Sequence, residues 1–472
     1  MVFSSTVFLF FYLPVTVVVY LVCPSKWKNT WLLFMSLLFY YWGGASFFII
    51  MLYSIAINYL GGRIIDILRK RKKNTWCKTA FVITLVLNIG NLVYWKYAVF
   101  LMQIVQEITG WRVQIPEILL PIGISFFTFQ GMSYVIDLYR KEVPVQRNLL
   151  KLALYIALFP QLIAGPIVRY SDIEKQLTNH RRSVDMFASG IRYFTIGLAK
   201  KAILANSVAL VSDKVFALSA DQRPVSVAWL GVICYTFQLY FDFSGYSDMA
   251  IGLGKMFGFE FPQNFNYPYI SCSITDFWHR WHISLSTWFR DYVYIPLGGS
   301  RKGNVYVHLF IVFLLTGIWH GASWNFVLWG IYFGILIIIE RWMFTKWKKR
   351  LIGIKWLGWL RTMFLWIVSM VPFRADTIED SISYYRCLFG IQQLNQVGFT
   401  LEYYIHRYEV FILIICSLTM LPIGKWLYRK LQRELPDGIF TMISNAGTLC
   451  LLGVSILYVV TSTYNPFIYF QF

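Results

Sequence analysis

Apolar residues recur in long runs from one end of the chain to the other. The main runs are Val7–Val22, Trp31–Trp42, Ser46–Leu60, Thr79–Trp95, Ile118–Ile136, Leu152–Ala164, Met186–Ala199, Val225–Phe241, His308–Ile339, Trp356–Leu360 continuing through Thr362–Phe373, Val410–Ile423 and Ile439–Tyr458. A spanning helix needs about 20 mainly apolar residues to cross roughly 30 Å of hydrocarbon. Several runs reach that length, and shorter ones suit tilted, broken or horizontal helices. The pattern predicts an all-α polytopic membrane protein with about ten to twelve membrane segments.

Composition excludes the two main structural alternatives. Hydrophobic residues make up 57% of the 472 residues and charged residues only 14%, against about 25% charged in soluble domains. A soluble helical core would lack polar faces to cover so many apolar runs. A β-barrel would instead show alternating segments of about ten residues. Because no repeat or long linker divides the chain, we expect residues 1–472 to form a single membrane domain.

The charges are strongly basic, with a formal excess of +20. In a soluble protein this excess would suggest nucleic-acid binding, but here the basic residues gather between apolar runs, so no nucleic-acid partner is expected. The clusters are Arg63, Arg69–Lys73 and Lys78; Arg341, Lys346, Lys348–Arg350, Lys355 and Arg361; and Lys425, Arg429, Lys430 and Arg433. Short basic loops stay in the cytoplasm. We therefore expect Arg69–Lys73 inside and 461–472 outside, and leave the order of segments between 165 and 301 open.

The densest group of polar residues runs from Tyr240 to Arg301. It includes Asp242 at the end of an apolar helix, and a stretch from 262 to 268 that two prolines keep out of regular helix. Irregular backbone at membrane depth is tolerated only where it is buried in protein or lines a wet cavity. The pattern therefore predicts a re-entrant or interfacial region at about 240–301.

Two histidines are candidates for chemistry within the membrane. His320 lies near the middle of a 32-residue run, 308–339, that contains no Asp, Glu, Lys or Arg. Imidazole titrates near neutral pH, so His320 is a candidate general base, although a buried structural histidine is the alternative. His279 and His282 would share a helix face, but a third ligand is not evident and the seven cysteines show no paired spacing. No metal site is expected, and His279 is interpreted as structural.

Several longer strings resemble the membrane-bound O-acyltransferase superfamily. Trp319-His320-Gly321 in a long apolar segment is similar to its signature. The strings Pro121–Gln130, Ala164–Ile167, Tyr240–Asp248, Phe277–Tyr292 and Asn465–Phe472 resemble its bacterial branch, which acetylates alginate or peptidoglycan or transfers D-alanine to teichoic acid. That C-terminal string is closer to the acetylating members. The branch usually reads Trp-Arg-Arg-Trp-His where this chain has Trp278-His-Arg-Trp-His282, so His279 departs from the pattern.

The resemblance implies a ring of helices around a central funnel, with His320 and His282 as the catalytic pair. His320 would be the general base, and His282, together with Asp276, would orient the donor or polarise its carbonyl. Substrate-binding roles would fall to Asp276, Trp319, Asn325, Trp278 and Asp242.

The implied function is that of a membrane O-acyltransferase in the bacterial cytoplasmic membrane, with no permanently bound cofactor. It would move an acyl group, with acetyl favoured, from a cytoplasmic thioester such as acetyl-CoA. The acceptor would be a hydroxyl of an extracytoplasmic polysaccharide or of a secreted partner acyltransferase of the Ser-Gly-Asn-His type. One alternative is D-alanyl transfer from a carrier protein to teichoic acid. An alternative of another class is a transporter or flippase, although the inverted repeats typical of transporters are not evident.

Overall fold

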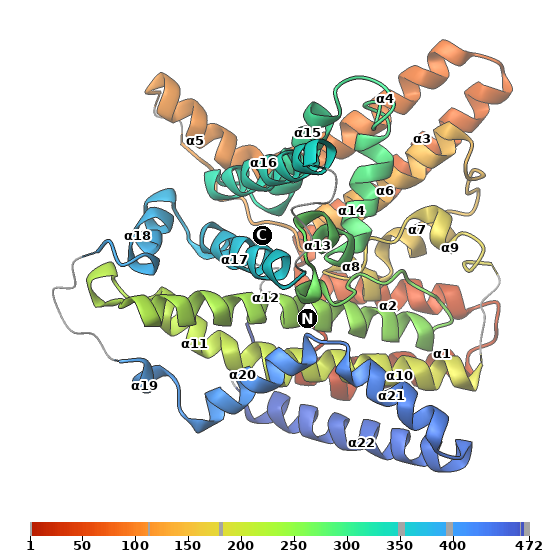
Figure 1. Ribbon diagram of the computed structural model, residues 1–472. Helices are drawn as coiled ribbons and strands as arrows, with labels where there is room; N and C mark the ends of the chain where they lie inside the picture. Colours follow the sequence, from red (N-terminus) through yellow and green to blue (C-terminus); the bar gives the residue numbers. More distant parts are fainter. Residues whose placement is uncertain are drawn as a thin grey trace. The chain divides into compact units, whose positions relative to one another are not determined.

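The computed structural model describes residues 2–111, 114–178, 183–347, 355–392, 400–462 and 464–466 (Figure 1). Within these ranges every regular element is a helix, which confirms the predicted all-α class. Their contacts group the chain into two compact units. Unit 1 contains 1–194 and 247–262, and unit 2 contains 195–246 and 263–472. The expectation of one membrane domain stays a prediction.

Unit 1 begins with a π-helical turn and continues through long apolar helices. Its elements are η1 (Phe8–Tyr12), α1 (Leu13–Val22), α2 (Lys28–Gly43), α3 (Ala45–Lys70), α4 (Asn74–Leu92), η2 (Val93–Tyr97), α5 (Ala98–Thr109), α6 (Ile124–Arg140), α7 (Leu149–Ala157), α8 (Phe159–Leu162), α9 (Tyr170–Ile173) and most of α10 (Val184–Ala199). Asn58 on α3 and Asn88 on α4 exchange side-chain hydrogen bonds of 3.0 and 3.1 Å. Such amide pairs join helices that apolar contacts alone would hold less specifically.

Unit 2 carries every candidate site residue predicted above. Its elements are η3 (Lys200–Ala205), α11 (Asn206–Phe216), η4 (Ala220–Gln222), most of α12 (Val225–Met256), η5 (Pro268–Ile270), α13 (Ile274–Arg280), α14 (Ile283–Phe289), η6 (Arg290–Tyr294), α15 (Val305–His320), α16 (Trp324–Trp347), α17 (Lys355–Arg374), α18 (Ile378–Leu388), α19 (Leu401–Tyr404), α20 (Arg407–Thr419), α21 (Ile423–Glu434) and α22 (Asp437–Thr461). Its core is aromatic: Phe277, Trp281 and Trp366 contact one another with ring centroids 4.2–5.7 Å apart.

Seven helices in the described part of the chain are long and apolar enough to cross a membrane, or eight if the bent pair α20–α21 is one span. This is fewer than the ten to twelve expected segments, because several apolar runs fold into shorter helices. The run Leu152–Ala164 is split between α7 and α8. The 32-residue run 308–339 is broken after His320, where Gly321 is extended and α16 begins only at Trp324.

The polar stretch 240–301 is divided between two kinds of structure. Its first part, through Asp248, belongs to the long helix α12. From Pro268 onward it forms the short elements η5, α13, α14 and η6, none long enough to span a bilayer. This arrangement agrees with the predicted re-entrant or interfacial region.

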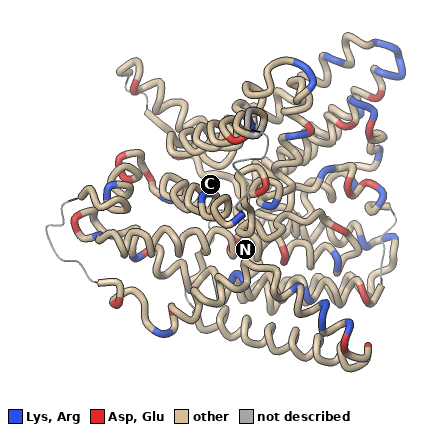
Figure 2. The backbone as a smooth tube through the Cα atoms, in the orientation of Figure 1, with Lys and Arg blue, Asp and Glu red and all other residues tan. Residues whose placement is uncertain are grey.

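Figure 2 shows Lys and Arg gathered at the turn between α3 and α4 and along α21.

Two predicted features lie outside the described residues. These are the basic residues Lys348, Lys349 and Arg350, and the last six residues of the C-terminal string, 467–472.

Candidate active site

His282 lies at a break between two short helices and is fully buried. It follows α13 and caps α14 with a left-handed backbone conformation, φ 44° and ψ 54°. A non-glycine residue in this region carries a backbone strain of about 1–3 kcal/mol and often marks a functional site. The break turns the imidazole into the core, where the Phe243 ring packs edge-on against it with centroids 4.6 Å apart.

Asn264 defines the hydrogen-bonding state of His282. Its side-chain oxygen lies 3.1 Å from His282 Nδ1 and also accepts from the backbone N–H and hydroxyl of Ser284, at 3.2 and 2.9 Å. Because an amide oxygen can only accept, Nδ1 carries the hydrogen and Nε2 presents a lone pair. Nε2 has no hydrogen-bond partner among the described residues.

Burial keeps His282 neutral. The apolar surroundings lower the pKa of its imidazole well below the usual range, and the charge interaction with His320 lowers that pKa further. At neutral pH, Nε2 can therefore accept a hydrogen bond or a proton but does not donate. This disfavours direct polarisation of a carbonyl by His282, one of the two roles that the resemblance implied.

His320 ends α15 and is 5% exposed. Its imidazole is packed edge-on by Trp329 and Phe373, with ring centroids 5.2 Å from each. His320 also lines a cavity of about 10 Å³ together with Leu239, Phe243, Trp281, Trp329, Trp366 and Phe373. A cavity this small has room for about one water molecule. This cavity, as the structure holds it, is lined mainly by aromatic side chains and is too small for a substrate.

The ring of Trp319 lies close to the rings of both histidines. Its ring centroid lies 5.8 Å from that of His282 and 5.1 Å from that of His320. The structure thus brings together the two residues predicted to be catalytic, and places the predicted Trp319 between them.

Close packing of α15 against α16 holds His320 in place. A Cβ atom on Gly317 would lie 2.3 Å from the Phe326 carbonyl oxygen and 2.8 Å from Gly330 Cα. Only glycine permits this approach of the two backbones.

A second, larger cavity of about 830 Å³ opens between α13, α14, η6, α15 and α16. Its walls include Trp278, Phe313, Val312 and Thr316, and its polar lining includes Asp276, His279, Arg290 and Arg341. The volume is in the range of small-molecule sites. Trp278 in this wall contacts Trp329 in the wall of the small cavity, with centroids 5.7 Å apart. The two rings form a partition between the cavities.

The other predicted substrate-binding residues have structural partners. Asp242 forms a fully buried ion pair with Lys201, with 2.8 Å between Oδ1 and Nζ. Asn325 donates to the Ala375 carbonyl at 2.7 Å, just beyond the end of α17. Asp276 pairs with Arg280 at 2.9 Å and lies in the wall of the large cavity. His279, interpreted as structural from the sequence, lines the same cavity.

Among the described residues, no three His, Cys, Asp or Glu side chains gather closely enough to hold a metal ion. The chemistry available at the site is that of two buried imidazoles among aromatic side chains.

Sequence reasoning missed Glu340, which anchors the start of α13. The carboxylate is buried on α16 and accepts from the backbone N–H groups of Ile274 and Thr275, at 3.1 and 2.8 Å. It also accepts from the Thr275 hydroxyl at 2.5 Å and pairs with the half-exposed Arg361 at 3.3 Å. A single acid directly after a long apolar run was the available signal, but its partners lie 65 residues away.

We expect Glu340→Ala to lower the free energy of unfolding by about 3 kcal/mol, because two buried amides lose a charged acceptor. Arg361→Ala, which removes only a half-exposed partner, should cost under about 1 kcal/mol. Unfolding of the purified protein in mixed detergent micelles measures both values. Equal losses in the two variants would show that the Glu340–Arg361 ion pair, and not the anchoring of α13, accounts for the effect.

Comparison with known proteins decides the family. The family model described as "MBOAT, membrane-bound O-acyltransferase family" matches residues 140–373, which include both histidines. A probable alginate O-acetylase of Pseudomonas putida is 38% identical over the whole length of both chains. The chain belongs to the membrane-bound O-acyltransferase family.

Two further relatives are named for the transfer of different acyl groups, acetyl and D-alanyl. A peptidoglycan O-acetyltransferase of Helicobacter pylori is 31% identical, over all of this chain and 97% of the relative. A teichoic acid D-alanyltransferase of Bacillus subtilis is 33% identical, over 50% of this chain and 62% of the relative. The predicted family, the enzyme class of O-acyltransferase and the multi-pass membrane character are confirmed.

Proposed function

We propose that the protein transfers an acetyl group from a cytoplasmic thioester to a hydroxyl acceptor on the opposite side of the membrane. The observation that carries this proposal is the buried pair His320 and His282, whose rings both lie against the ring of Trp319. His320 lies in the middle of a long charge-free run of the sequence, at the break between α15 and α16, and this position supports a reaction between a donor from one side and an acceptor from the other.

The choice of acetyl over D-alanyl follows from how far each likeness extends. The acetylating relatives match over the full length of this chain, whereas the D-alanyl relative matches half of it. The acceptor is a hydroxyl of an extracytoplasmic polysaccharide, such as alginate or peptidoglycan, or of a secreted partner acyltransferase of the Ser-Gly-Asn-His type. Location in a bacterial cytoplasmic membrane is part of this proposal.

The 830 Å³ cavity supplies a place for the donor. Its apolar walls suit the arm that carries a thioester, while Arg290, Arg341 and His279 suit the phosphates at the far end of that arm. Arg341 belongs to the basic cluster that the positive-inside rule places in the cytoplasm. Thr316 lines this cavity one helical turn before His320, so the thioester would approach the partition formed by Trp278 and Trp329.

In the proposed reaction His320 accepts the proton of the acceptor hydroxyl. The hydroxyl oxygen then attacks the thioester carbonyl carbon, a C–O bond forms and the C–S bond breaks. The departing sulfur takes the proton back from His320, so atoms and charge balance. A positioned base of this kind contributes about 10²–10⁴ in rate. His282 orients a substrate by accepting a hydrogen bond at Nε2.

Arg341→Gln should raise the KM for acetyl-CoA about tenfold with little change in kcat, because one charge-assisted contact to a phosphate is lost. Lys355→Gln is the matched control, since Lys355 belongs to the same basic cluster but does not line the cavity. Steady-state kinetics of the reconstituted protein give both constants. If the KM is unchanged in Arg341→Gln, the phosphates of the donor do not bind at this end of the cavity.

The donor itself is tested by offering acetyl-CoA and a D-alanyl-loaded carrier protein to the purified protein in parallel. We expect acceptor-dependent thioester cleavage with acetyl-CoA and none with the carrier. Cleavage with the carrier alone would replace acetyl transfer by D-alanyl transfer. Cleavage of neither, in protein shown to be folded, would count against the proposed donors.

A further inference from the structure

Helix α21 has two opposite faces, one apolar and one basic. Ile423, Leu427 and Leu431 recur every four residues, and so form one row along the helix. Lys425, Arg429 and Arg433 form a second row, offset by two residues or about 200°, on the opposite side. Such a helix is typical of one that lies in the boundary between lipid and water.

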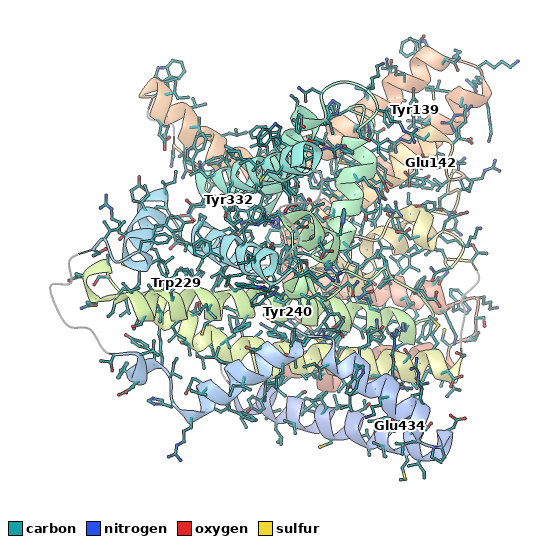
Figure 3. All side chains as sticks on the ribbon, viewed as in Figure 1. Tyr139, Glu142, Trp229, Tyr240, Tyr332 and Glu434 are labelled. Carbon is teal, nitrogen blue, oxygen red and sulfur yellow. The ribbon has the colours of Figure 1, made fainter. Side chains whose placement is uncertain are left out.

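The chain connection places this helix at a membrane surface. The last residue of α21, Glu434, labelled in Figure 3, is followed by only two residues before α22 begins at Asp437. Helix α22 is a candidate span of 25 residues with a mean hydropathy of 1.8 in its most apolar part. Since α22 must start at the boundary, the end of α21 lies there too. The ring of Tyr428 on α21 contacts Phe440 in the first turn of α22, with centroids 5.0 Å apart.

The direction of α21 fits a position along that surface. It is bent by 66° from α20, so it does not continue straight on from the preceding helix. The three residues of its basic row, Lys425, Arg429 and Arg433, are exposed, and among the described residues none of these three pairs with an acidic side chain. Three such charges inside hydrocarbon would be costly, whereas at the boundary they meet headgroups.

The basic face of α21 also borders a cavity. A cavity of about 440 Å³ is lined by Pro422, Lys425, Trp426, Arg429, Lys430, Arg433 and Glu434. Lys430 is held by its neighbours, 5.4 Å above the Trp426 ring and 4.0 Å from the Glu434 carboxylate. Lys425, Arg429 and Arg433 are left to face the cavity. Figure 2 shows this basic row on α21 beside the uncharged length of α22.

We propose that the basic face of α21 binds the phosphate groups of anionic phospholipids in the leaflet that the positive-inside rule assigns to the cytoplasm. The apolar row of α21 lies among the acyl chains, and the guanidinium groups of Arg429 and Arg433 hold the phosphodiester. The lipid is the chosen occupant because a charged face directly beside a lipid-exposed span meets headgroups before it meets any soluble ligand. Helix α21 thus fixes the depth at which α22 enters the bilayer.

The test measures lipids retained by the full-length protein in neutral micelles that contain equal amounts of phosphatidylglycerol and phosphatidylcholine. Native mass spectrometry counts the bound lipids. We expect the wild type to retain phosphatidylglycerol preferentially. The variant Lys425→Gln/Arg429→Gln/Arg433→Gln should lose at least tenfold of that preference, since each basic residue near an anionic surface contributes about fivefold.

The matched control removes three charges from another basic segment expected on the same side of the membrane, in the variant Arg71→Gln/Lys72→Gln/Lys73→Gln. It should lose less of the preference than the α21 variant, because these three residues lie in a turn and not in one row along an amphipathic helix. A second variant, Lys425→Arg/Arg429→Lys/Arg433→Lys, keeps the charge and should retain the preference, which separates charge from folding. The proposal is overturned if phosphatidylcholine is retained equally, or if both glutamine variants lose the same amount. Displacement of the lipid by millimolar inorganic phosphate would also overturn it, because the site would then bind free anions.

Discussion

Replacement of His320 by glutamine is expected to lower acyl transfer by about 10²–10⁴, with the protein still folded in the membrane. Glutamine keeps the approximate size and polarity of the side chain but cannot accept the hydroxyl proton. The loss should appear in kcat, because the proton is transferred in the reaction step and not on binding. Thiol release from acetyl-CoA in the presence of acceptor measures it.

His308→Gln is the matched control for this variant. His308 is a second buried histidine on the same helix, α15, and its Nδ1 lies 2.9 Å from the Gly299 carbonyl oxygen, outside the small cavity. We expect it to retain most of the activity. Equal losses of activity in the two variants would indicate that α15 tolerates no histidine replacement. They would then give no support to His320 as the base.

The second large effect is expected at the buried ion pair. Lys201→Met removes the cation that pairs with the buried Asp242 inside unit 2, and removal of one partner from a buried pair costs about 3–5 kcal/mol. The wild-type Lys201 ammonium also donates to the Pro466 carbonyl, so the variant loses a contact to the end of the described chain as well. Unfolding in mixed detergent micelles measures the loss.

The double variant Lys201→Met/Asp242→Asn separates charge from packing. Because it leaves no uncompensated charge, it should recover at least half of the stability lost in the single variant. A double variant as unstable as the single one would show that the contacts of the Lys201 side chain, and not the ion pair, hold this region together.

The residues of the site could be predicted from the sequence where a rare residue type stands in a uniform background. His320 in a charge-free run was found this way, and the family resemblance added His282 as its partner. The structure brings the two together at Trp319. Neither their common neighbour nor the left-handed turn at His282 is encoded in local spacing. Both depend on how α13, α14 and α15 pack.

The partners of buried charges could not be predicted. Asp242 required a cation, since an acid among apolar residues is costly when unpaired, but many basic residues were available. Lys201 on η3 is the partner of Asp242 on α12 because the folded chain brings these two elements together. Glu340 and Asn264 were missed for the same reason, because their partners lie 65 and 18 residues away in the sequence. The lengths of the helices could not be predicted, because apolar content does not reveal a break such as that at Gly321.

The balance between the two products of one reaction tests acyl transfer through His320 most directly. The purified full-length protein, reconstituted in vesicles with acetyl-CoA and a hydroxyl acceptor, is followed for free thiol and for acetyl ester on the acceptor. We predict one ester for each thiol released, at a rate that falls by about 10²–10⁴ in His320→Gln. Thiol release without ester, or ester formation at the wild-type rate in His320→Gln, would contradict acyl transfer through His320.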